Sequence, residues 1–358
     1  MRGVYLFERM VRWPRRTRAS TPEVVAAPRS RGEDRAPVGS LAPVTVTWRP
    51  EDPGEGSPLV AIQPQPQGGR RPFFMVHPIG GYVLCYVPLA RHLDPDRPFY
   101  GLAAPGLADE PDRSESVEEM AGRYVAAVRR IQPSGPYMVG GYSFGCHVAF
   151  EMAQQLRRAG EQTALLALLD AWAPGPIGSW RWSPDVEDAV LAAGLLRQYA
   201  HACGRALAIA NDTLRRCRTE DEALAYLLTQ AKAAVLVPED VDLGWVRRFL
   251  QGFKTRVEVA AKYMPDVYPG SITLFRSAEN EDELLGNSGV ARRSDPSKGW
   301  TRLSTEPVEI HTVPGHHETL LGEPHVQVLA RLLGESLDRA EARLAARHQR
   351  GALPRVGP

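Results

Sequence analysis

The clearest potential for chemistry lies in residues 141–145, which read Gly-Tyr-Ser-Phe-Gly. A short apolar run, residues 137–140, precedes them, and residues 144–158 have the apolar spacing of a helix. A serine between two glycines at a strand-to-helix turn occupies a turn so tight that a side chain at either glycine would collide with its neighbours. Such a turn, here called the elbow, lifts the hydroxyl above the edge of the sheet, so the sequence predicts Ser143 as a nucleophile.

A serine nucleophile requires an imidazole base, and the imidazole requires a carboxylate that orients it. With this kind of turn the partners follow in the order serine, acid, histidine. Asp170 ends the strand predicted after the elbow helix and is the favoured acid; Glu279 and Asp282, after a later strand, are the alternatives. His316 and His317 both follow the last predicted strand, and the residues alone leave the base open between them.

Acyl transfer also needs backbone donors for the oxyanion. The residue after the nucleophile supplies one of them in this arrangement, which here is the N–H of Phe144. Residues 77–81, His-Pro-Ile-Gly-Gly, follow an early strand and fit the second donor. Because proline has no N–H, Ile79 is the first donor after it, and the glycines permit close approach of the backbone. We expect His77 to be a structural hydrogen-bonding residue.

Composition argues against several other classes of function. The 358 residues carry 43 Lys and Arg against 42 Asp and Glu, and a net charge of +1 does not suit a nucleic-acid binder. No apolar run approaches the roughly 20 residues of a membrane span, and no apolar leader segment follows the N-terminal arginines, which predicts a soluble, cytoplasmic protein. The cysteines show no C-x-x-C spacing, so we expect neither a disulfide framework nor a zinc site: they are Cys85, Cys146, Cys203 and Cys217.

Strand and helix signals alternate from residue 58 onward, which is typical of an α/β fold with a doubly wound, mostly parallel sheet. Ser116 and Glu119 form a capping box before one of the helices. Predicted strands cover residues 59–62, 73–76, 98–101, 137–140, 165–169, 272–275 and 308–313, and predicted helices include residues 117–128, 144–158 and 324–345.

Residues 175–262 interrupt this alternation and read as mainly helical, which predicts a lid inserted between two strands. Its predicted helices cover residues 185–202, 219–234 and 243–263, the second behind a capping box of Thr219 and Glu222. Residues 1–55 are rich in Arg and Pro and residues 347–358 lack periodicity, so we expect both to be disordered around one domain at residues 56–346.

Several separated motifs together resemble a known family. From about residue 57 to 333 the sequence resembles the thioesterase domains that end nonribosomal peptide and polyketide synthases, which are α/β-hydrolases. The matching segments are Val76-His77-Pro78-Ile79-Gly80-Gly81 with Tyr86 and Leu89, Gly101-Leu102-Ala103-Ala104-Pro105-Gly106-Leu107, Gly140-Gly141-Tyr142-Ser143-Phe144-Gly145, Leu169-Asp170 and Val313-Pro314-Gly315-His316-His317.

The resemblance implies a chemistry and favours particular residues. Family members take an acyl chain from the phosphopantetheine arm of a carrier protein onto the serine, then release it to water or to an internal nucleophile. The family pattern favours Asp170 as the acid and His317 as the base, and it makes residues 175–262 a lid over an acyl channel. Two departures are His316, where the family often has Asp or Asn, and Cys146, where it often has Gly; we expect Cys146 to pack beside the elbow.

We therefore expect a serine thioesterase that works through an acyl-enzyme on Ser143, with Asp170, His317 and the Ile79 and Phe144 N–H groups, and that needs no metal or diffusible cofactor. Its expected partner is an acyl or peptidyl carrier protein, with no nucleic acid and no membrane. No carrier segment precedes residue 57, so the enzyme is expected to be free-standing although it resembles the product-release type.

Three alternatives remain open at this stage: a trans-acting editing thioesterase, a lipase-like carboxylesterase and, outside enzymes, a carrier-docking module without turnover. In the lid, Trp245, Phe249 and Phe253 share one helical stripe. Such a stripe could line the acyl channel, but we expect most of these side chains to pack within the lid.

Overall fold

The computed structural model describes residues 57–63, 69–104, 115–175, 187–202, 207, 209, 211–279 and 295–351. Several features considered above lie outside the described residues. These are the predicted extension 1–55, residues 105–107, Cys203, Asp282 and the end of the chain from residue 352.

The core of the fold is a seven-stranded sheet with the order β1-β3-β2-β4-β5-β6-β7. Every neighbouring pair is parallel except β1 and β3, which confirms the predicted mostly parallel, doubly wound sheet. The strands are β1 (Leu59–Gln63), β2 (Phe73–Val76), β3 (Phe99–Leu102), β4 (Tyr137–Tyr142), β5 (Thr163–Leu169), β6 (Thr273–Ser277) and β7 (Glu309–Val313). β4 and most of β5 are buried, as continuous apolar runs in a covered parallel sheet should be.

The register of these strands brings the loops of interest to one edge. Val76 at the end of β2 pairs with Gly141 of β4, and Leu169 at the end of β5 lies between Tyr142 and Phe275. Because parallel strands end on the same side, the loops after β2, β4, β5, β6 and β7 meet at the carboxyl edge. The sheet therefore assembles segments that are far apart in the sequence.

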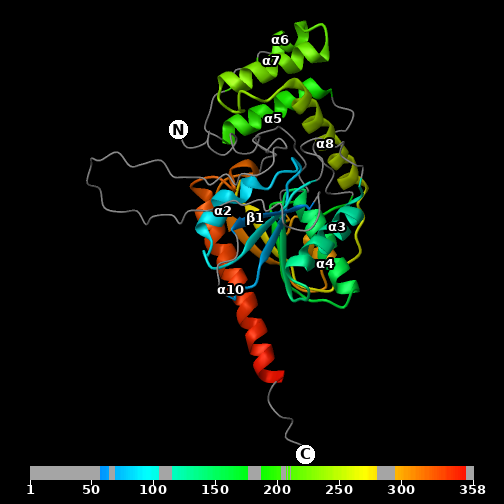
Figure 1. Ribbon diagram of the computed structural model, residues 1–358, viewed down its shortest axis with the longest axis vertical. Coiled ribbons are helices and arrows are strands. Elements are labelled where there is room, and N and C mark those ends of the chain that lie inside the picture. The colour runs from blue at the N-terminus through cyan, green and yellow to red at the C-terminus, as the bar shows by residue number, and fades with distance from the viewer. Residues whose placement is uncertain are drawn as a thin grey trace, which may run out of the picture.

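Helices cover both faces of the sheet (Figure 1). Helices α3 (Val117–Ile131) and α4 (Gly145–Arg158) pack on one face, while α2 (Val87–His92) and α10 (His325–Gly351) pack on the other. The capping box predicted for α3 is confirmed, since Ser116 Oγ accepts from the Glu119 N–H and the Glu119 carboxylate accepts from the Ser116 N–H.

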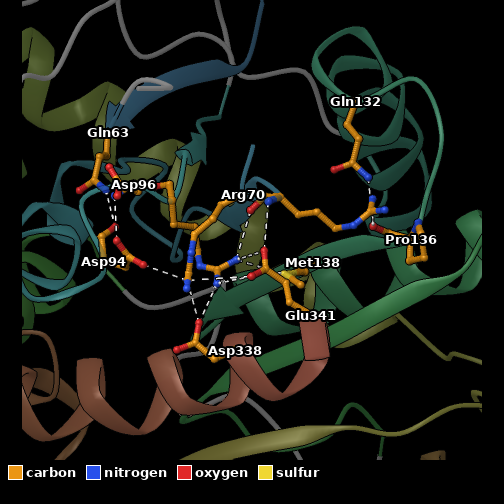
Figure 2. Close-up of polar contacts among 11 residues, drawn as sticks. Gln63, Arg70, Asp94, Asp96, Gln132, Pro136, Met138, Asp338 and Glu341 are labelled. Atoms are coloured by element: carbon orange, nitrogen blue, oxygen red, sulfur yellow. Dashed lines mark hydrogen bonds and ion pairs between the residues drawn. The ribbon is translucent and has the colours of Figure 1, made fainter. Parts of the chain in front are cut away.

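Ion pairs hold α10 against the amino-terminal side of the sheet. The buried guanidinium of Arg97 donates to Glu341 at 2.9 Å and to Asp338 at 3.0 Å. Arg70 pairs with Asp338 at 2.7 Å and with Asp94 at 2.9 Å, and Figure 2 shows these carboxylates gathered around Arg70. A buried guanidinium is stable only with such partners, so this network fixes the direction of α10 at the side of the sheet opposite to the carboxyl edge.

The helical block between β5 and β6 forms a small core of its own. It consists of α5 (Asp188–Ala202), α6 (Asn211–Arg216), α7 (Glu220–Ala233) and α8 (Leu243–Lys262). In Figure 1, α5, α6 and α7 lie together beyond the carboxyl edge, and α8 runs from them back towards α3 and α4. The buried residues shared by these helices include Leu191, Leu224, Leu227, Leu250 and Phe253.

The structure differs from the sequence predictions in local details. At α7 the Thr219 hydroxyl accepts from the Glu222 N–H, but the Glu222 carboxylate accepts from the Arg218 N–H, so the predicted capping box is only half formed. Helix α10 continues to Gly351, past the predicted end at residue 345, so residues 347–351 of the tail that was expected to be disordered are helical. Ala346, Arg347 and Gln349 favour this extension, since each is a good helix former. The short elements α2, α6, η1 (Leu84–Tyr86), η3 (Trp300–Leu303) and η4 (His317–Thr319) were not predicted.

Within the described part of the chain, no helix combines the length and the apolar character that a membrane crossing demands.

Candidate active site

Ser143 lies on a sharp turn between β4 and α4, in the strand–serine–helix order that the sequence predicted. Its φ of 56° falls in the left-handed region, which is strained for a residue with a side chain. Two backbone hydrogen bonds offset this strain: the Ser143 N–H donates to Leu169 O at 3.0 Å, and Ser143 O accepts from the Cys146 N–H at 3.0 Å. The first bond fixes the serine beside the end of β5.

Both glycines of the motif are required by close packing. A Cβ at Gly141 would overlap the carbonyl group of Gly145, and a Cβ at Gly145 would lie 2.5 Å from the carbonyl oxygen of Val76. Cys146 is fully buried beneath the turn, with Sγ 3.1 Å from Gly141 O. Burial raises the pKa of this thiol, so Cys146 is a packing residue, as expected.

Asp170 follows β5 and is almost completely buried, with 2% of its surface exposed. Its Oδ1 accepts from the backbone N–H of Ser277 at 2.8 Å and from Lys298 Nζ at 2.5 Å. Its Oδ2 accepts from Ser277 Oγ at 2.9 Å and pairs with His317 Nδ1 at 3.0 Å. Each carboxylate oxygen thus has two donors, and they come from the end of β6, the turn before η3 and the segment after β7.

The electrostatics of this cluster favour an ionised carboxylate. Burial by itself would raise the pKa of Asp170, but the Lys298 ammonium and the hydrogen bond with His317 hold that pKa well below its usual range. Asp170 is therefore an anion at neutral pH and acts only as a hydrogen-bond acceptor towards His317.

Of the two adjacent histidines, His317 is the one that contacts Asp170. Its ring stacks on Tyr142, with centroids 4.7 Å apart, and the Tyr142 hydroxyl donates to His317 O at 2.6 Å. Because Tyr142 directly precedes Ser143, these contacts hold the imidazole beside the elbow. His316 is buried, and Glu279, the alternative acid, has an exposed side chain.

The loop after β2 is held by side chains on both sides of Ile79. The carbonyl of Pro78 accepts from His77 Nδ1 at 2.7 Å and from the Gly81 N–H at 2.8 Å, which fixes the peptide that carries the Ile79 N–H. His77 thus has the structural role expected of it. On the other side, Arg256 Nε of α8 donates to Ile79 O at 2.5 Å. The loop lies beside the elbow, since Gly145 is packed against the carbonyl groups of Val76 and His77.

Aromatic side chains of α8 contact the same loop. Trp245 and Phe249 stack on each other with centroids 5.4 Å apart, and both stack on Tyr82, at 6.2 and 6.4 Å. Phe253 instead packs in the core of the helical block. The side chains of the stripe predicted from the sequence are therefore divided: some contact the loop after β2, and Phe253 packs inside the helical block.

Four residues of this site were missed by the sequence analysis: Tyr142, Arg256, Ser277 and Lys298. Arg256 carried a signal, because it is a charged residue between the apolar positions Phe253 and Val257 of one helix face. Ser277 and Lys298 follow no motif, and only the folding of their loops onto Asp170 identifies them. Among the described residues, no group of three or more His, Cys, Asp and Glu side chains is arranged to hold a metal ion.

Comparison with known proteins assigns the family. Residues 71–337 match the family model described as thioesterase domain. The chain belongs to this family. The chondramide synthase of Chondromyces crocatus is 30% identical over 276 residues, which cover 76% of this chain and 7% of that protein. Across the synthetases with the strongest matches, the matched region spans between 1% and 30% of their length.

Solved structures agree with this assignment. The four-domain nonribosomal peptide synthetase AB3403 matches with a TM-score of 0.67 at 28% identity, over 78% of this chain and 20% of that chain. The Vlm2 thioesterase domain, solved with a bound dodecadepsipeptide, matches with a TM-score of 0.54 at 25% identity, over 78% of this chain and 97% of that domain. The fold is thus that of an α/β-hydrolase thioesterase domain of nonribosomal peptide synthesis.

The close approach at the elbow predicts a strong effect of a single methyl group. Gly141→Ala should lower the free energy of unfolding by about 3 kcal/mol or more, because the added Cβ overlaps backbone atoms that cannot move aside. Urea unfolding followed by circular dichroism measures this. In the control, Gly334→Ala in α10, the nearest atom to the new Cβ is 3.9 Å away, so stability should be unchanged or rise by up to about 1 kcal/mol. Equal stability of the two variants would contradict the packing described.

Two buried histidines near the site predict a loss of stability in acid. Burial lowers the pKa of His77 to about 3 and that of His147 to about 4. In the unfolded chain these rings bind a proton below about pH 6.5, whereas in the folded protein they stay neutral. Acidification from pH 7 to pH 5 therefore favours unfolding by about 2 kcal/mol for each ring.

The His147 contribution can be isolated by substitution. His147 Nε2 lies 2.9 Å from Trp172 O, and His147→Gln keeps a donor for that carbonyl without a titrating ring. The difference in unfolding free energy between pH 7 and pH 5 should be about 2 kcal/mol smaller in this variant than in the wild type. A pH dependence identical to that of the wild type would show that His147 is not held neutral.

Proposed function

We propose that this chain is a serine thioesterase that releases an acyl, peptidyl or polyketide chain from the phosphopantetheine thioester of a carrier protein. The observation that carries the proposal is the contact between His317 Nδ1 and the buried Asp170 carboxylate, at 3.0 Å, beside the elbow of Ser143. An imidazole oriented by an ionised carboxylate is the base that a serine hydroxyl requires. The proposed chemistry uses protein groups only, with no metal or diffusible cofactor.

Acylation begins with attack of Ser143 Oγ on the thioester carbonyl carbon while His317 Nε2 takes the hydroxyl proton. The negative charge that develops on the carbonyl oxygen is stabilised by the N–H groups of Ile79 and Phe144. The carbon–sulfur bond then breaks, and the proton moves from His317 to the departing thiolate. An ester on Ser143 and the free thiol of the carrier arm are the products of this half-reaction.

Deacylation repeats these steps with a different nucleophile. His317 takes a proton from water, or from a hydroxyl or amine of the acyl chain itself, and the nucleophile attacks the ester carbonyl. Collapse of the second oxyanion returns the proton to Ser143 Oγ. Water yields a free acid, and an internal nucleophile yields a ring.

The family of this chain and one solved structure that it matches support this substrate class. The matching family model is that of thioesterase domains. The Vlm2 thioesterase domain, whose structure matches this chain, holds a dodecadepsipeptide. An aromatic surface from Tyr82, Trp245 and Phe249 adjoins the loop that carries Ile79, so a long acyl or peptidyl chain on Ser143 would leave the site along apolar side chains.

The proposal predicts a covalent intermediate that intact-protein mass spectrometry can detect. After mixing with a carrier protein loaded with a hexanoyl-phosphopantetheine thioester, the wild-type chain should carry a hexanoyl adduct on Ser143 and release hexanoic acid. His317→Ala should lose turnover by several orders of magnitude, because the base is gone, and Ser143→Ala should carry no adduct. The matched control is His316→Ala, which removes the neighbouring ring and should keep turnover near that of the wild type.

Other outcomes would replace the proposal. Cleavage of p-nitrophenyl hexanoate with no release from the carrier would favour a carboxylesterase. Preference for short misloaded chains over long peptidyl chains would favour an editing thioesterase. Tight binding of the carrier with no release, and no effect of Ser143→Ala on that binding, would leave a docking module.

The bond from α8 to the loop of Ile79 predicts a further effect on turnover. Arg256→Met should lower kcat for hexanoyl-N-acetylcysteamine by roughly tenfold, less than the ~10²–10³-fold lost with an oxyanion donor, because the loop loses a fixed carbonyl but keeps its N–H. The control Arg248→Met removes an exposed guanidinium from the same helix and should have no such effect. Wild-type kcat in a folded Arg256→Met protein would contradict this role of Arg256.

A further inference from the structure

A lysine side chain is built into the acidic end of the proposed triad. Lys298 Nζ lies 2.5 Å from Asp170 Oδ1, and the lysine residue is 8% exposed. The general serine, histidine and acid scheme has no need of this cation. Burying an ammonium group costs free energy unless an opposite charge is beside it, and here the Asp170 carboxylate supplies that charge.

The turn that presents Lys298 is anchored at several points. The Asp295 carboxylate accepts from the N–H groups of Ser297 and Gly299, at 2.9 and 2.8 Å, and from Ser297 Oγ at 2.6 Å. Within this turn Lys298 has a φ of 48° and Gly299 a φ of 83°. A left-handed φ at a residue with a long side chain is strained, and such strain persists only where surrounding bonds impose it.

Two more bonds fasten the turn to the segment that follows Asp170. The Ala173 N–H donates to Lys298 O at 2.8 Å, and the indole N–H of the fully buried Trp300 donates to Ala171 O at 2.8 Å. The ammonium therefore keeps its place relative to the carboxylate because one backbone hydrogen bond and one indole hydrogen bond join the Lys298 turn to the residues that directly follow Asp170.

We propose that Lys298 is a positioning residue that orients the Asp170 carboxylate and offsets its charge, so that His317 remains a neutral base in more acidic solution. The inference rests on the proposed function of Ser143, Asp170 and His317. With Oδ1 held by Lys298 and Ser277, Oδ2 is directed at His317 Nδ1. The imidazolium that forms during catalysis then faces a carboxylate already paired with a cation, which attracts a proton less strongly than a bare one.

Other charged and titratable groups surround His317 and stay constant across the comparison. They are Tyr142 from β4, Ser143 at the elbow, Asp170 after β5, Ser277 after β6, and His316 and Glu318 beside it in sequence. Helix α5 packs on η4 and carries Asp188, which is paired with Lys254, and the exposed Arg197. Substitution of Lys298 alone therefore isolates the effect of its charge.

The test is the pH dependence of labelling by a small alkyl fluorophosphonate, measured on the full chain from pH 5 to pH 9. In this reaction Ser143 Oγ bonds to phosphorus, fluoride leaves and His317 takes the hydroxyl proton, so the rate falls where His317 is protonated. In Lys298→Met the acid limb should move upward by roughly one to two pH units, because loss of the cation raises the proton affinity of His317. Lys298→Arg, which keeps the charge, should leave the limb near its wild-type position.

Two further variants separate charge from hydrogen bonding. Ser277→Ala removes a neutral donor from the same carboxylate, so it should lower the labelling rate at every pH with a much smaller movement of the limb. Lys298→Gln keeps a donor without the charge and should move the limb as Lys298→Met does; it serves as the test if Lys298→Met does not fold. Folding of each variant is checked by its thermal transition.

The results distinguish this inference from the proposed function. If wild-type Ser143 is labelled and His317→Ala abolishes labelling, but neither uncharged Lys298 variant moves the acid limb, the proposed function stands and the role of Lys298 is overturned. A uniform fall in rate at all pH values would assign Lys298 a merely structural role and would also overturn it. Failure to label wild-type Ser143 would overturn both.

Discussion

The buried carboxylate of Asp170 imposes the strictest physical demand in this structure. A carboxylate with almost no exposed surface is stable only where hydrogen bonds and a compensating charge replace the water it has lost. Its partners Ser277, Lys298 and His317 lie 107, 128 and 147 residues further along the chain. The end of β6, the turn before η3 and the segment after β7 must therefore converge on one point, and the arrangement of the carboxyl edge follows from that convergence.

The sheet makes this convergence possible with few elements. Parallel pairing of β4, β5, β6 and β7 places the carboxyl ends of four strands side by side, and the segment at each end contributes at least one group to the site. The hydrogen bond from the Ser143 N–H to Leu169 O ties the elbow to the residue before Asp170. Close packing at Gly141 and Gly145 then sets the height of the elbow over the sheet. Covered faces and tight glycine contacts leave little freedom for the loops to separate.

Local patterns were sufficient to predict the fold, the elbow and the strand ends that carry Asp170 and His317. Each of these depends on residues close in sequence, such as the apolar run of β5 or the capping box at Ser116. The choice between His316 and His317 could not be made locally, because both follow the same strand; the family resemblance favoured His317, and only this ring meets Asp170. The partners of Lys298 and Arg256 could not be predicted, since each side chain bonds to an atom more than a hundred residues away and no motif links the two positions. The roles of all these residues in catalysis stay predictions.

The contacts between α8 and the loop after β2 have a thermodynamic consequence. A buried guanidinium and a backbone carbonyl lose their mutual bond if α8 moves away, and both must then be solvated anew. Displacement of the helical block and disorder of the loop around Ile79 are therefore linked equilibria. Linkage is reciprocal, so any ligand that binds only to the ordered loop favours the inward position of α8 by the same free energy with which α8 favours its binding.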